Sequence, residues 1–574
     1  MGEEEELNGK LLVAMVTYEN GLTSFPRSFA LEKAAGRLAV SLLRYADAVR
    51  YLESAAARAT QDPEVAYYLG LAHEQLGRNR DAQTMYESAA LLPAFREAAH
   101  LRLAELLART DRDNEALALL RSIPGDLRAV EETVALDNAM GRPDEARVLF
   151  RGEAPALSPF LEFEQAKQPS QDERLMRFLA ADPDRVLNIA AEYMRLGLYR
   201  RALEVLSLQY PAVPADQTEP GAVLPQHHPI VARYRAYCRE KLNEPPNADD
   251  ALAEKMPLAY IFPSGAITLD VLQSALQRDS QDAAAHYLLG TLYLSYGQTD
   301  PAISSWEKAG RLNPRLPTLH ADLGRALLHI RNDPARAREV FQEGMSADPE
   351  NPEIYIGMDQ TLSLLGRSAR ERVEALQRYP DSAGMPTELV YKLALNRAES
   401  GDYDGALALF PGRFFPRQEG GTNVRQVWLE VKILQLLDFA RAGHCDAFHS
   451  IAPDLGKGVA ALDFTQDGMD PLIQSARVQY LLGTGESQCG RPDEAAAHFR
   501  AAADSISPAE IVWARRAAHM LPGYDDSTWQ PRLEAALAGI EGEIETRSLK
   551  GIWIYAAGVI ERELGRQEAA RSRP

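Results

Sequence analysis

The chain has 574 residues, which is too long for one ordinary compact domain. Its formal net charge of −20 at pH 7 argues against a nucleic-acid-binding protein and against docking on anionic lipid, since both need a basic surface. With 46% hydrophobic and 25% charged residues, the composition is typical of a folded chain and not of a disordered one.

The three cysteines, Cys238, Cys445 and Cys489, lie far apart in the sequence. Their odd number and wide spacing predict neither a disulfide framework nor a C-x-x-C site, and a reducing compartment is the simplest interpretation. The first residues, MGEEEELNGK, are acidic where a signal peptide would carry positive charge. No stretch approaches the roughly 18 apolar residues of a membrane span. We therefore expect a cytoplasmic protein.

Residues 1–151 are predicted to form helical repeats, because apolar residues recur at spacings of three and four and the alternation of a strand is missing. A short helix is expected at Lys10–Glu19. The clearest repeat follows it, with Leu69-Gly70 in its first helix and Ala82 and Tyr86 in its second. Weaker copies of this pattern surround it.

Residues 152–260 carry degenerate repeats in which prolines interrupt the period. A helix is still expected at Gln171–Ala181. Pro211–His228 contains four prolines and is predicted to be a loop, with His227-His228 in solvent. Met256–Gly265 is predicted to be an extended break with exposed aromatic residues.

Residues 261–422 are predicted to form the central repeats, and they contain the most regular unit of the chain, Asp282–Pro314. In it, Leu289-Gly290 is followed by Tyr293, Gly297, Ala302, Trp306, Ala309 and Pro314. This is the spacing of the tetratricopeptide repeat, an antiparallel helix pair of about 34 residues. Small residues are expected where two helices cross, because they let the backbones approach. Pro411–Thr422 is predicted to be a glycine-rich loop.

Residues 423–574 are predicted to form further repeats, with a clear unit marked by Leu482-Gly483, Ala495 and Phe499. The short run Gly483–Glu486 lies within a repeat helix, so it lacks the preceding strand that a dinucleotide site needs. The fold class predicted for the whole chain is all-α, a tetratricopeptide-like α-α superhelix of about 11–12 helix pairs.

Three segments, taken together, resemble the tetratricopeptide repeat region of the bacterial DUF5107 family. They are Ile261-Phe262-Pro263 ahead of the helix ITLDVLQSAL, the run HYLLGTLYLSYGQTDPAISSWEKA, and Arg413–Gly421. The resemblance implies a repeat region that accompanies a β-rich domain similar to carbohydrate-binding folds. It therefore implies a β-rich domain of the same family as a partner, and a carbohydrate as a ligand.

Four tyrosines occupy the same position of their repeats, three residues before the small crossing residue: Tyr67, Tyr287, Tyr391 and Tyr480. This position of the first helix normally faces the concave groove, so these rings, with Arg325, could hold peptide side chains or sugars. The alternative is that they pack between adjacent first helices. Successive groove positions lack the Lys and Asn pattern of a carboxylate clamp.

The loop Arg413–Gly421 supplies further candidate binding residues, namely Arg413, Phe415 and Glu419, since its glycines allow close backbone approach. The alternative is a structural insertion that packs on its own repeat. The run HCDAFH places Cys445 and His449 four residues apart, but further metal ligands are not evident, and no metal or cofactor is predicted.

The leading functional hypothesis is a non-catalytic scaffold that binds a protein or peptide partner in its concave groove. The chain contains no G-x-S-x-G, H-E-x-x-H or Walker motif, so an enzyme is not predicted. The alternative hypothesis is the helical accessory region of a carbohydrate-active or carbohydrate-binding bacterial protein. A groove lined by apolar and tyrosine side chains, without convergent carboxylates, would favour the first hypothesis. A gene sequence that continues upstream into a β-rich domain would favour the second.

Overall fold

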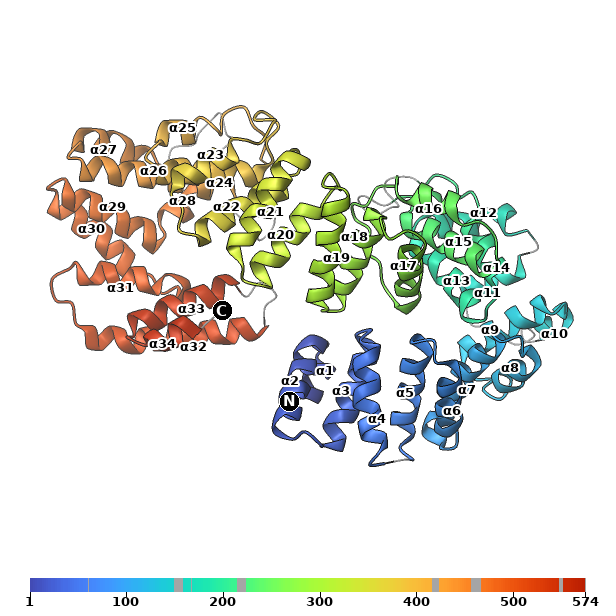
Figure 1. The fold of residues 1–574 in the computed structure, drawn as a ribbon. Coiled ribbons are helices and arrows are strands. Elements are labelled where there is room, and N and C mark those ends of the chain that lie inside the picture. The colour runs from blue at the N-terminus through green and yellow to red at the C-terminus, as the bar shows by residue number, and fades with distance from the viewer. Residues whose placement is uncertain are drawn as a thin grey trace. The chain divides into compact units, whose positions relative to one another are not determined.

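The computed structural model of the chain describes residues 1–59, 61–148, 158–166, 168–213, 223–415, 423–455, 466–546 and 551–572. Every regular element in these residues is a helix, and successive helices form pairs of the tetratricopeptide type, which confirms the predicted fold class (Figure 1). The chain divides into two compact units, Met1–Asn332 and Asp333–Pro574. The finer division at residues 151, 260 and 422 stays a prediction.

The first unit holds helices α1 to α20. They are α1 (Gly2–Leu7), α2 (Leu11–Ser24), α3 (Phe29–Ser41), α4 (Tyr45–Ala56), α5 (Pro63–Gln75), α6 (Asn79–Ala90), α7 (Pro93–Ala108), α8 (Asp113–Leu120), α9 (Leu127–Ala139), α10 (Pro143–Val148), α11 (Pro159–Gln165), α12 (Glu173–Ala180), α13 (Pro183–Arg195), α14 (Tyr199–Leu206), α15 (Pro229–Lys241), α16 (Asn247–Ala253), α17 (Ala266–Arg278), α18 (Ala283–Ser295), α19 (Thr299–Leu312) and α20 (Leu319–His329).

The second unit holds helices α21 to α34. They are α21 (Pro334–Ala347), α22 (Pro352–Leu364), α23 (Ala369–Leu376), α24 (Thr387–Glu399), α25 (Tyr403–Leu407), α26 (Val424–Arg441), α27 (Cys445–Ile451), α28 (Gln466–Ile473), α29 (Ala476–Gln488), α30 (Pro492–Ala503), α31 (Ile511–His519), α32 (Asp526–Thr546), α33 (Gly551–Glu563) and α34 (Gln567–Ser572).

The helix pairs close where a small residue of the first helix meets a large residue of the second. A Cβ atom at Gly290 in α18 would lie 2.5 Å from Trp306 Cδ1 in α19, so glycine is required at this crossing. Gly70 in α5 would meet Tyr86 in α6 at 2.7 Å. In both pairs the large residue comes sixteen positions after the glycine. The same spacing and contact recur for Gly36 with Leu52 and for Gly483 with Phe499.

Trp306 also bonds across the crossing that it fills. Its side chain is only 1% exposed, and its indole Nε1 donates a hydrogen bond of 3.0 Å to the backbone carbonyl oxygen of Tyr287. A buried indole usually bonds through its N–H, because an N–H without an acceptor would cost free energy. The predicted role of small residues at helix crossings is therefore confirmed, and the tryptophan adds a polar contact to it.

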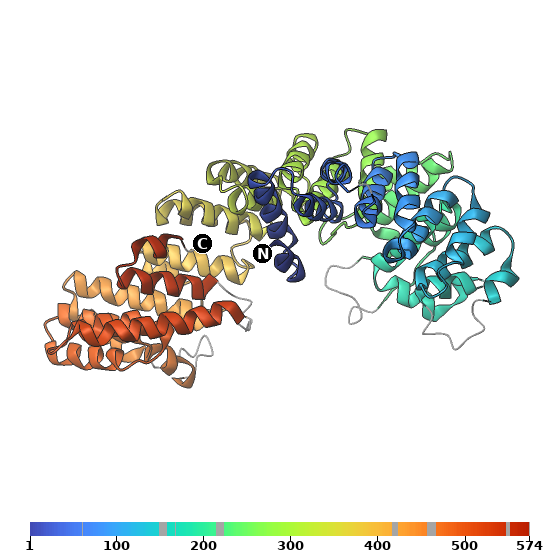
Figure 2. The same ribbon diagram turned by 90° about the horizontal axis from the view of Figure 1, so that it is seen from below.

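The first unit curves until its early helices lie beside its late ones. Gln298, which precedes α19, donates its Nε2 hydrogen to the carbonyl oxygen of Leu42 at 2.9 Å. A side chain at Gly297 would collide with Leu12 of α2. Residues of α4, α5, α17 and α19 line one common pocket, and Figure 1 draws these helices facing each other. Figure 2 shows the same approach from below, with the blue helices of the early part beside the green ones of the late part. Residues at opposite ends of this unit therefore share one environment.

Aromatic residues fill the crossings of the second unit. Phe341 of α21 lies against Gly357 of α22, and Phe448 of α27 lies against Gly485 of α29. Both phenylalanine side chains are fully buried.

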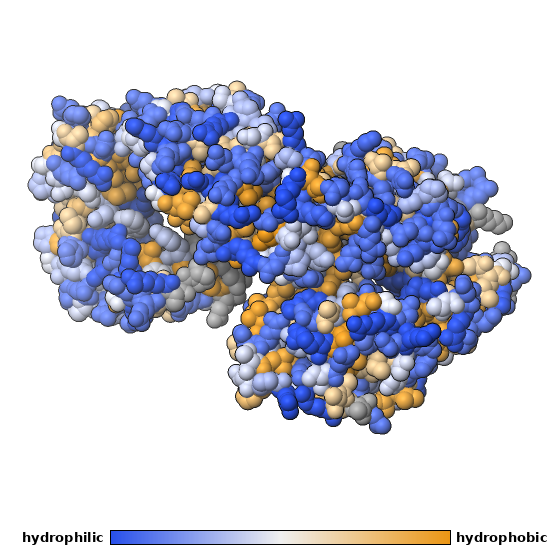
Figure 3. Space-filling model, in the orientation of Figure 1, coloured by the Kyte–Doolittle hydropathy of each residue, from blue (hydrophilic) through white to orange (hydrophobic). Residues whose placement is uncertain are grey.

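The visible face of the molecule is largely hydrophilic, with apolar residues scattered over it (Figure 3). None of the helices in the described part of the chain combines the length and the apolar content of a membrane-spanning segment.

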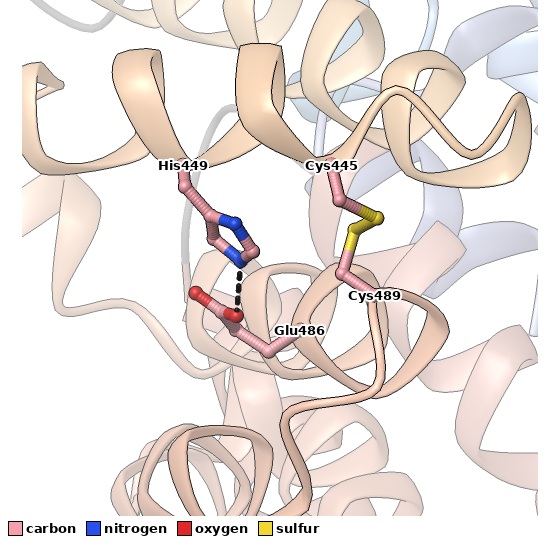
Figure 4. The surroundings of a disulfide bond; sticks show 4 residues. All are labelled: Cys445, His449, Glu486 and Cys489. Carbon is pink, nitrogen blue, oxygen red and sulfur yellow. Dashed lines mark hydrogen bonds and ion pairs between the residues drawn. A yellow bond between two sulfur atoms is a disulfide. The ribbon is translucent and has the colours of Figure 1, made fainter.

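A disulfide joins Cys445, the first residue of α27, to Cys489, which caps the C-terminus of α29, with Cα atoms 5.5 Å apart (Figure 4). The prediction that the cysteines do not form a disulfide is therefore wrong. The packing of Phe448 on Gly485 brings α27 and α29 together and so places the two cysteines in reach of each other. The cysteines therefore no longer indicate a reducing compartment, and a cytoplasmic location stays a prediction.

The close crossing of α18 and α19 predicts a strong effect of Gly290→Ala. The added methyl group should displace Trp306 and weaken its hydrogen bond to Tyr287, which should lower the free energy of unfolding by about 2–3 kcal/mol. Urea unfolding of the full chain measures this change. Gly125→Ala is the control, because a Cβ atom at Gly125 meets no atom within 4 Å. Equal stability of the two variants would contradict this packing.

The disulfide predicts a specific thiol count. Protein purified without reductant and unfolded in guanidinium chloride should react with Ellman's reagent at one thiol per chain, that of Cys238. After reduction the count should rise to three. Because the bond closes a long loop, reduction should also lower the stability of the second unit by about 3–4 kcal/mol. A count of three before reduction would show that Cys445 and Cys489 are not joined.

Candidate functional site

A cavity of about 440 Å³ lies between the early and late helices of the first unit. Its walls come from α5 and α7 on one side and from α13, α15 and α17 on the other, together with the segment just before α17. Most of these are the first helices of their pairs. The cavity therefore exists because the unit curves back on itself, and it collects residues that are far apart in the sequence.

The segment before α17 forms part of the cavity wall. Phe262 is 75% exposed, and Pro263, Ser264 and Gly265 line the cavity beside it. Gly265 precedes α17 with a φ of +84°, and its N–H donates to the hydroxyl oxygen of Tyr296 at 2.9 Å. The left-handed φ favours glycine at this turn. The Phe-Pro segment noted in the sequence thus lies at the cavity.

The arginines of the cavity are bonded to groups of the fold itself. Arg109 donates to Glu74 at 2.6 Å and to the carbonyl oxygen of Arg195 at 2.8 Å. Arg102 bonds to Glu74 and Glu105, while Arg195 pairs with Glu192. Their positive charges are therefore compensated inside the first unit.

Glu74 holds this arginine cluster together. Burial alone would raise the pKa of Glu74, but Arg102 and Arg109 hold that pKa below its ordinary value. The carboxylate also accepts a hydrogen bond from the hydroxyl of Tyr86, the residue that fills the crossing of α5 and α6. The cavity wall and the helix crossing are thus joined through one carboxylate.

Two carboxylates of the cavity, Asp184 and Asp270, form no ion pair within the described residues. Burial raises the pKa of Asp270 to about 6, because the cavity wall shields the carboxylate from water and Lys241 and Arg109 only partly offset this. Burial and Asp182 also raise the pKa of Asp184. The charged groups of the cavity wall that lack an ion-pair partner in the described residues are therefore carboxylates.

Aromatic rings stand close to Asp270. The rings of Tyr199 and Tyr237 meet edge to face, with centroids 6.3 Å apart, and both line the cavity. Burial raises the pKa of each tyrosine, and the charge of Asp270 adds to the shift in both. Tyr234 also lines the cavity and bonds through its hydroxyl to Thr268 at 2.8 Å. One carboxylate and two tyrosine rings thus share one part of the wall.

Several buried polar atoms of the wall lack a partner within the described residues. They include Nδ1 of His228, Oε1 of Gln75 and Nε of Arg102. His228 is only 9% exposed, so the expectation that it lies in solvent is wrong: the turn at Pro225–His227 places it at the N-cap of α15, in the wall of the cavity. Burial lowers the pKa of His228 to about 4, so it is neutral at pH 7.

The candidate residues predicted in the first unit lie outside this cavity. Tyr67 packs against Phe95 of the next first helix, with ring centroids 5.5 Å apart. Tyr287 stacks on Trp306, and its hydroxyl donates to Asp322 at 2.7 Å. Arg325 bonds to the same aspartate at 2.6 Å. The structure therefore brings Tyr287 and Arg325 together through Asp322, between successive first helices.

The candidate residues predicted in the second unit form two groups. Tyr391 stacks on Phe415 with centroids 5.7 Å apart, and Arg413 donates to the backbone carbonyl oxygens of Ser382 and Ala383. Tyr480 packs on Trp513 and Phe499. Glu419 lies outside the described residues. Binding at any of these residues stays a prediction.

His449 and Cys445 of the run HCDAFH are both bonded within the fold. His449 Nε2 lies 2.9 Å from Glu486 Oε2, and Cys445 is in the disulfide (Figure 4). The described residues contain no group of three or more His, Cys, Asp or Glu side chains that could hold a metal ion.

Comparisons with known proteins give only distant similarity. No family model matches the chain, and no curated protein matches it. Among solved structures, it is similar to YrrB, "a TPR protein with an unusual peptide-binding site", with 16% identity over 41% of this chain and 92% of that one and a TM-score of 0.24. It is similar to the Naa15/Naa10 complex bound to HypK-THB, with 13% identity over 99% and 91% and a TM-score of 0.22.

A tetratricopeptide repeat protein from Parabacteroides merdae is also similar, with 12% identity over 62% of this chain and 98% of that one and a TM-score of 0.22. Values this low carry no argument by themselves. The evidence for the repeat fold is the chain's own succession of helix pairs with close crossings, and by this architecture the protein is tetratricopeptide-like.

The raised pKa of Asp270 predicts that this carboxylate weakens the fold at neutral pH. Its folded pKa of about 6 lies above the unfolded value, so the folded chain gains stability as the pH falls from 7 through about 6. Asp270→Asn should raise the free energy of unfolding at pH 7 by about 1–2 kcal/mol, a figure reduced for the water that reaches the cavity.

The same variant should lose the extra stability that the wild type gains near pH 5. Urea unfolding at the two pH values measures both effects. Asp81→Asn removes an exposed carboxylate outside the cavity and should keep most of the stability that the wild type gains between pH 7 and 5. If Asp270→Asn is less stable than the wild type at pH 7, Asp270 has a favourable charge partner and this account of the cavity is wrong.

Proposed function

We propose that the chain is a non-catalytic tetratricopeptide repeat scaffold that binds a protein or peptide partner in a concave groove, and that the cavity of the first unit is part of this groove. The observation that carries the proposal is the cavity of about 440 Å³ lined mainly by first helices, with the exposed ring of Phe262 beside it. Concave surfaces built by first helices are the usual binding surfaces of helical repeats.

The composition of the cavity wall supports binding by shape, rings and a few charges. Leu187, Met194 and Ile230 contribute apolar surface, while Tyr199 and Tyr237 contribute rings with a polar end. Rigid aromatic anchors and partly desolvated charges supply most of the binding energy at protein interfaces. An extended segment of a partner, with one side chain inserted, fits a cavity of this size better than a folded surface does.

We also propose that the resemblance to the repeat region of the DUF5107 family reflects a shared binding surface. The Phe-Pro segment that carries the resemblance lines the cavity, and this supports a common binding surface. The predicted contacts at Tyr67, Tyr287, Arg325, Tyr391, Tyr480, Arg413, Phe415 and Glu419 belong to the same proposal, as secondary contacts along the repeats. A β-rich domain of the family is one partner that the proposal includes.

Photo-crosslinking from the cavity wall tests this function. The photoreactive amino acid p-benzoylphenylalanine would replace Phe262 in the full chain, and cells of the source organism would supply the extract. We expect a protease-sensitive adduct at this position. The control position is Leu91, which is also 75% exposed but lies outside the cavity.

Equal adducts at Phe262 and Leu91, or adducts that survive protease and contain sugar, would contradict the proposal. The second of these outcomes would favour the carbohydrate-binding alternative. The comparison needs the same yield and melting behaviour of both labelled chains, so that a difference in adducts reports the position and not the amount of folded protein.

A further inference from the structure

The charges of the cavity wall favour one kind of occupant. Arg102, Arg109 and Arg195 are each paired with a glutamate of the fold, and Nε of Arg102 is the one group of these three guanidiniums that is buried without a partner among the described residues. Asp184 and Asp270 have no ion pair within the described residues. A group that enters the cavity therefore meets two carboxylates without an ion-pair partner, and of these Asp270 is the one that is shielded from water while Asp184 is exposed. An ionised carboxylate shielded from water gains more from a cation than an exposed one does.

The rings beside Asp270 also favour a cation. Tyrosine rings carry negative charge on their faces and attract ammonium and guanidinium groups within about 6 Å. Tyr237 already shows this property, because Lys241 Nζ lies 4.9 Å from the centroid of its ring. Lys241 itself does not line the cavity. Tyr199 meets Tyr237 edge to face, so the two rings form a corner next to the carboxylate.

Buried polar atoms without partners give a third, independent sign of a ligand. His228 is nine-tenths buried, its Nδ1 has no hydrogen-bond partner within the described residues, and it lines the cavity. Oε1 of Gln75 is buried in the opposite wall and is also unpartnered. Such atoms are costly unless something bonds to them. The backbone N–H and C=O groups of a bound peptide could form hydrogen bonds with both His228 and Gln75.

We propose that the cavity binds an organic cation, the ammonium or guanidinium group of a lysine or arginine side chain of the partner, between Asp270 and the rings of Tyr199 and Tyr237. This inference rests on the proposed function, because it assigns the side chain that the partner inserts. Asp270 supplies the ion pair, the two rings surround the cation, and His228 and Gln75 hold the peptide backbone near it. Free amines share this chemistry and are the other source of such a cation.

Peptide titration with the full chain tests this assignment. The probe is a fluorescein-labelled Ala-Ala-Lys-Ala-Ala peptide, capped at both ends, and the matched neutral probe carries norleucine in place of lysine. Fluorescence anisotropy measures both. We expect the lysine peptide, or the corresponding arginine peptide, to bind at least about tenfold more tightly than the norleucine peptide. One ion pair shielded from water gives a difference in affinity of this size.

The variants locate the cation. Asp270→Asn should abolish the preference for lysine over norleucine, and Tyr199→Leu should reduce it. Asp81→Asn, which removes a carboxylate outside the cavity, should leave it unchanged. Because Asp270→Asn is expected to be at least as stable as the wild type, loss of binding in this variant reports recognition and not unfolding.

Each other outcome separates this inference from the proposed function. If the norleucine peptide binds as tightly as the lysine peptide, the cation assignment falls and the peptide scaffold stands. If neither peptide binds while the adduct at Phe262 still forms, the cation assignment is wrong and the proposed function stands. If butylammonium displaces the lysine peptide at equal concentration, the cavity takes a free amine, and peptide recognition is overturned.

Discussion

The close crossing of two helices at a small residue is the interaction on which the rest of this structure depends. At Gly290 and Trp306 the backbones approach because one side carries no side chain and the other fills the space. A helix pair closed in this way has its apolar faces turned to the neighbouring pairs, and it must be stacked to be stable. Repetition of this geometry produces the curvature, and in the first unit the curvature brings α4 and α5 beside α17 and α19.

The cavity is a consequence of that closure, and its charges differ from those of the surrounding wall. Other buried charges among the described residues of the first unit are paired: Glu74 with Arg109, and the fully buried Arg233 with Asp250 and Asp282. Asp270 has no such ion pair, and burial raises the pKa of its carboxyl. A group that weakens the fold and faces a cavity is typical of a binding site, where stability is given up for recognition.

The architecture could be predicted from the sequence because its signals are local. Gly70 and Tyr86, or Gly290 and Trp306, lie sixteen residues apart and belong to one helix pair, so their spacing already indicates the contact. Tyr287 was correctly placed on a first helix. The contacts of Tyr287 could not be predicted in the same way, because they are made by the next repeat. There, Thr318 and Asp322 bond to the hydroxyl of Tyr287.

The cavity could not be predicted, because it joins residues from opposite ends of the first unit. Asp270 follows no motif, and its isolation is visible only once the surrounding arginines are seen to bond elsewhere. His228 stands next to an exposed His227 and after a proline-rich segment, which suggests solvent, yet one turn of chain buries it. The disulfide has the same cause, since Cys445 and Cys489 approach only through the packing of Phe448 on Gly485. Among the described residues of the three segments that resemble the DUF5107 family, only residues of the first segment, which includes Phe262-Pro263, lie in the wall of the cavity.

Hydrogen exchange on the full chain, with and without the lysine peptide, tests the central claim most directly: that closure of the first unit creates the binding site. Ordering of a cavity by its ligand slows the exchange of backbone amides around it. The account predicts added protection in α13, α15 and α17 and in residues 262–265, with the exchange of α29 and α30 unchanged. Protection confined to the second unit, or spread evenly over both units, would contradict it.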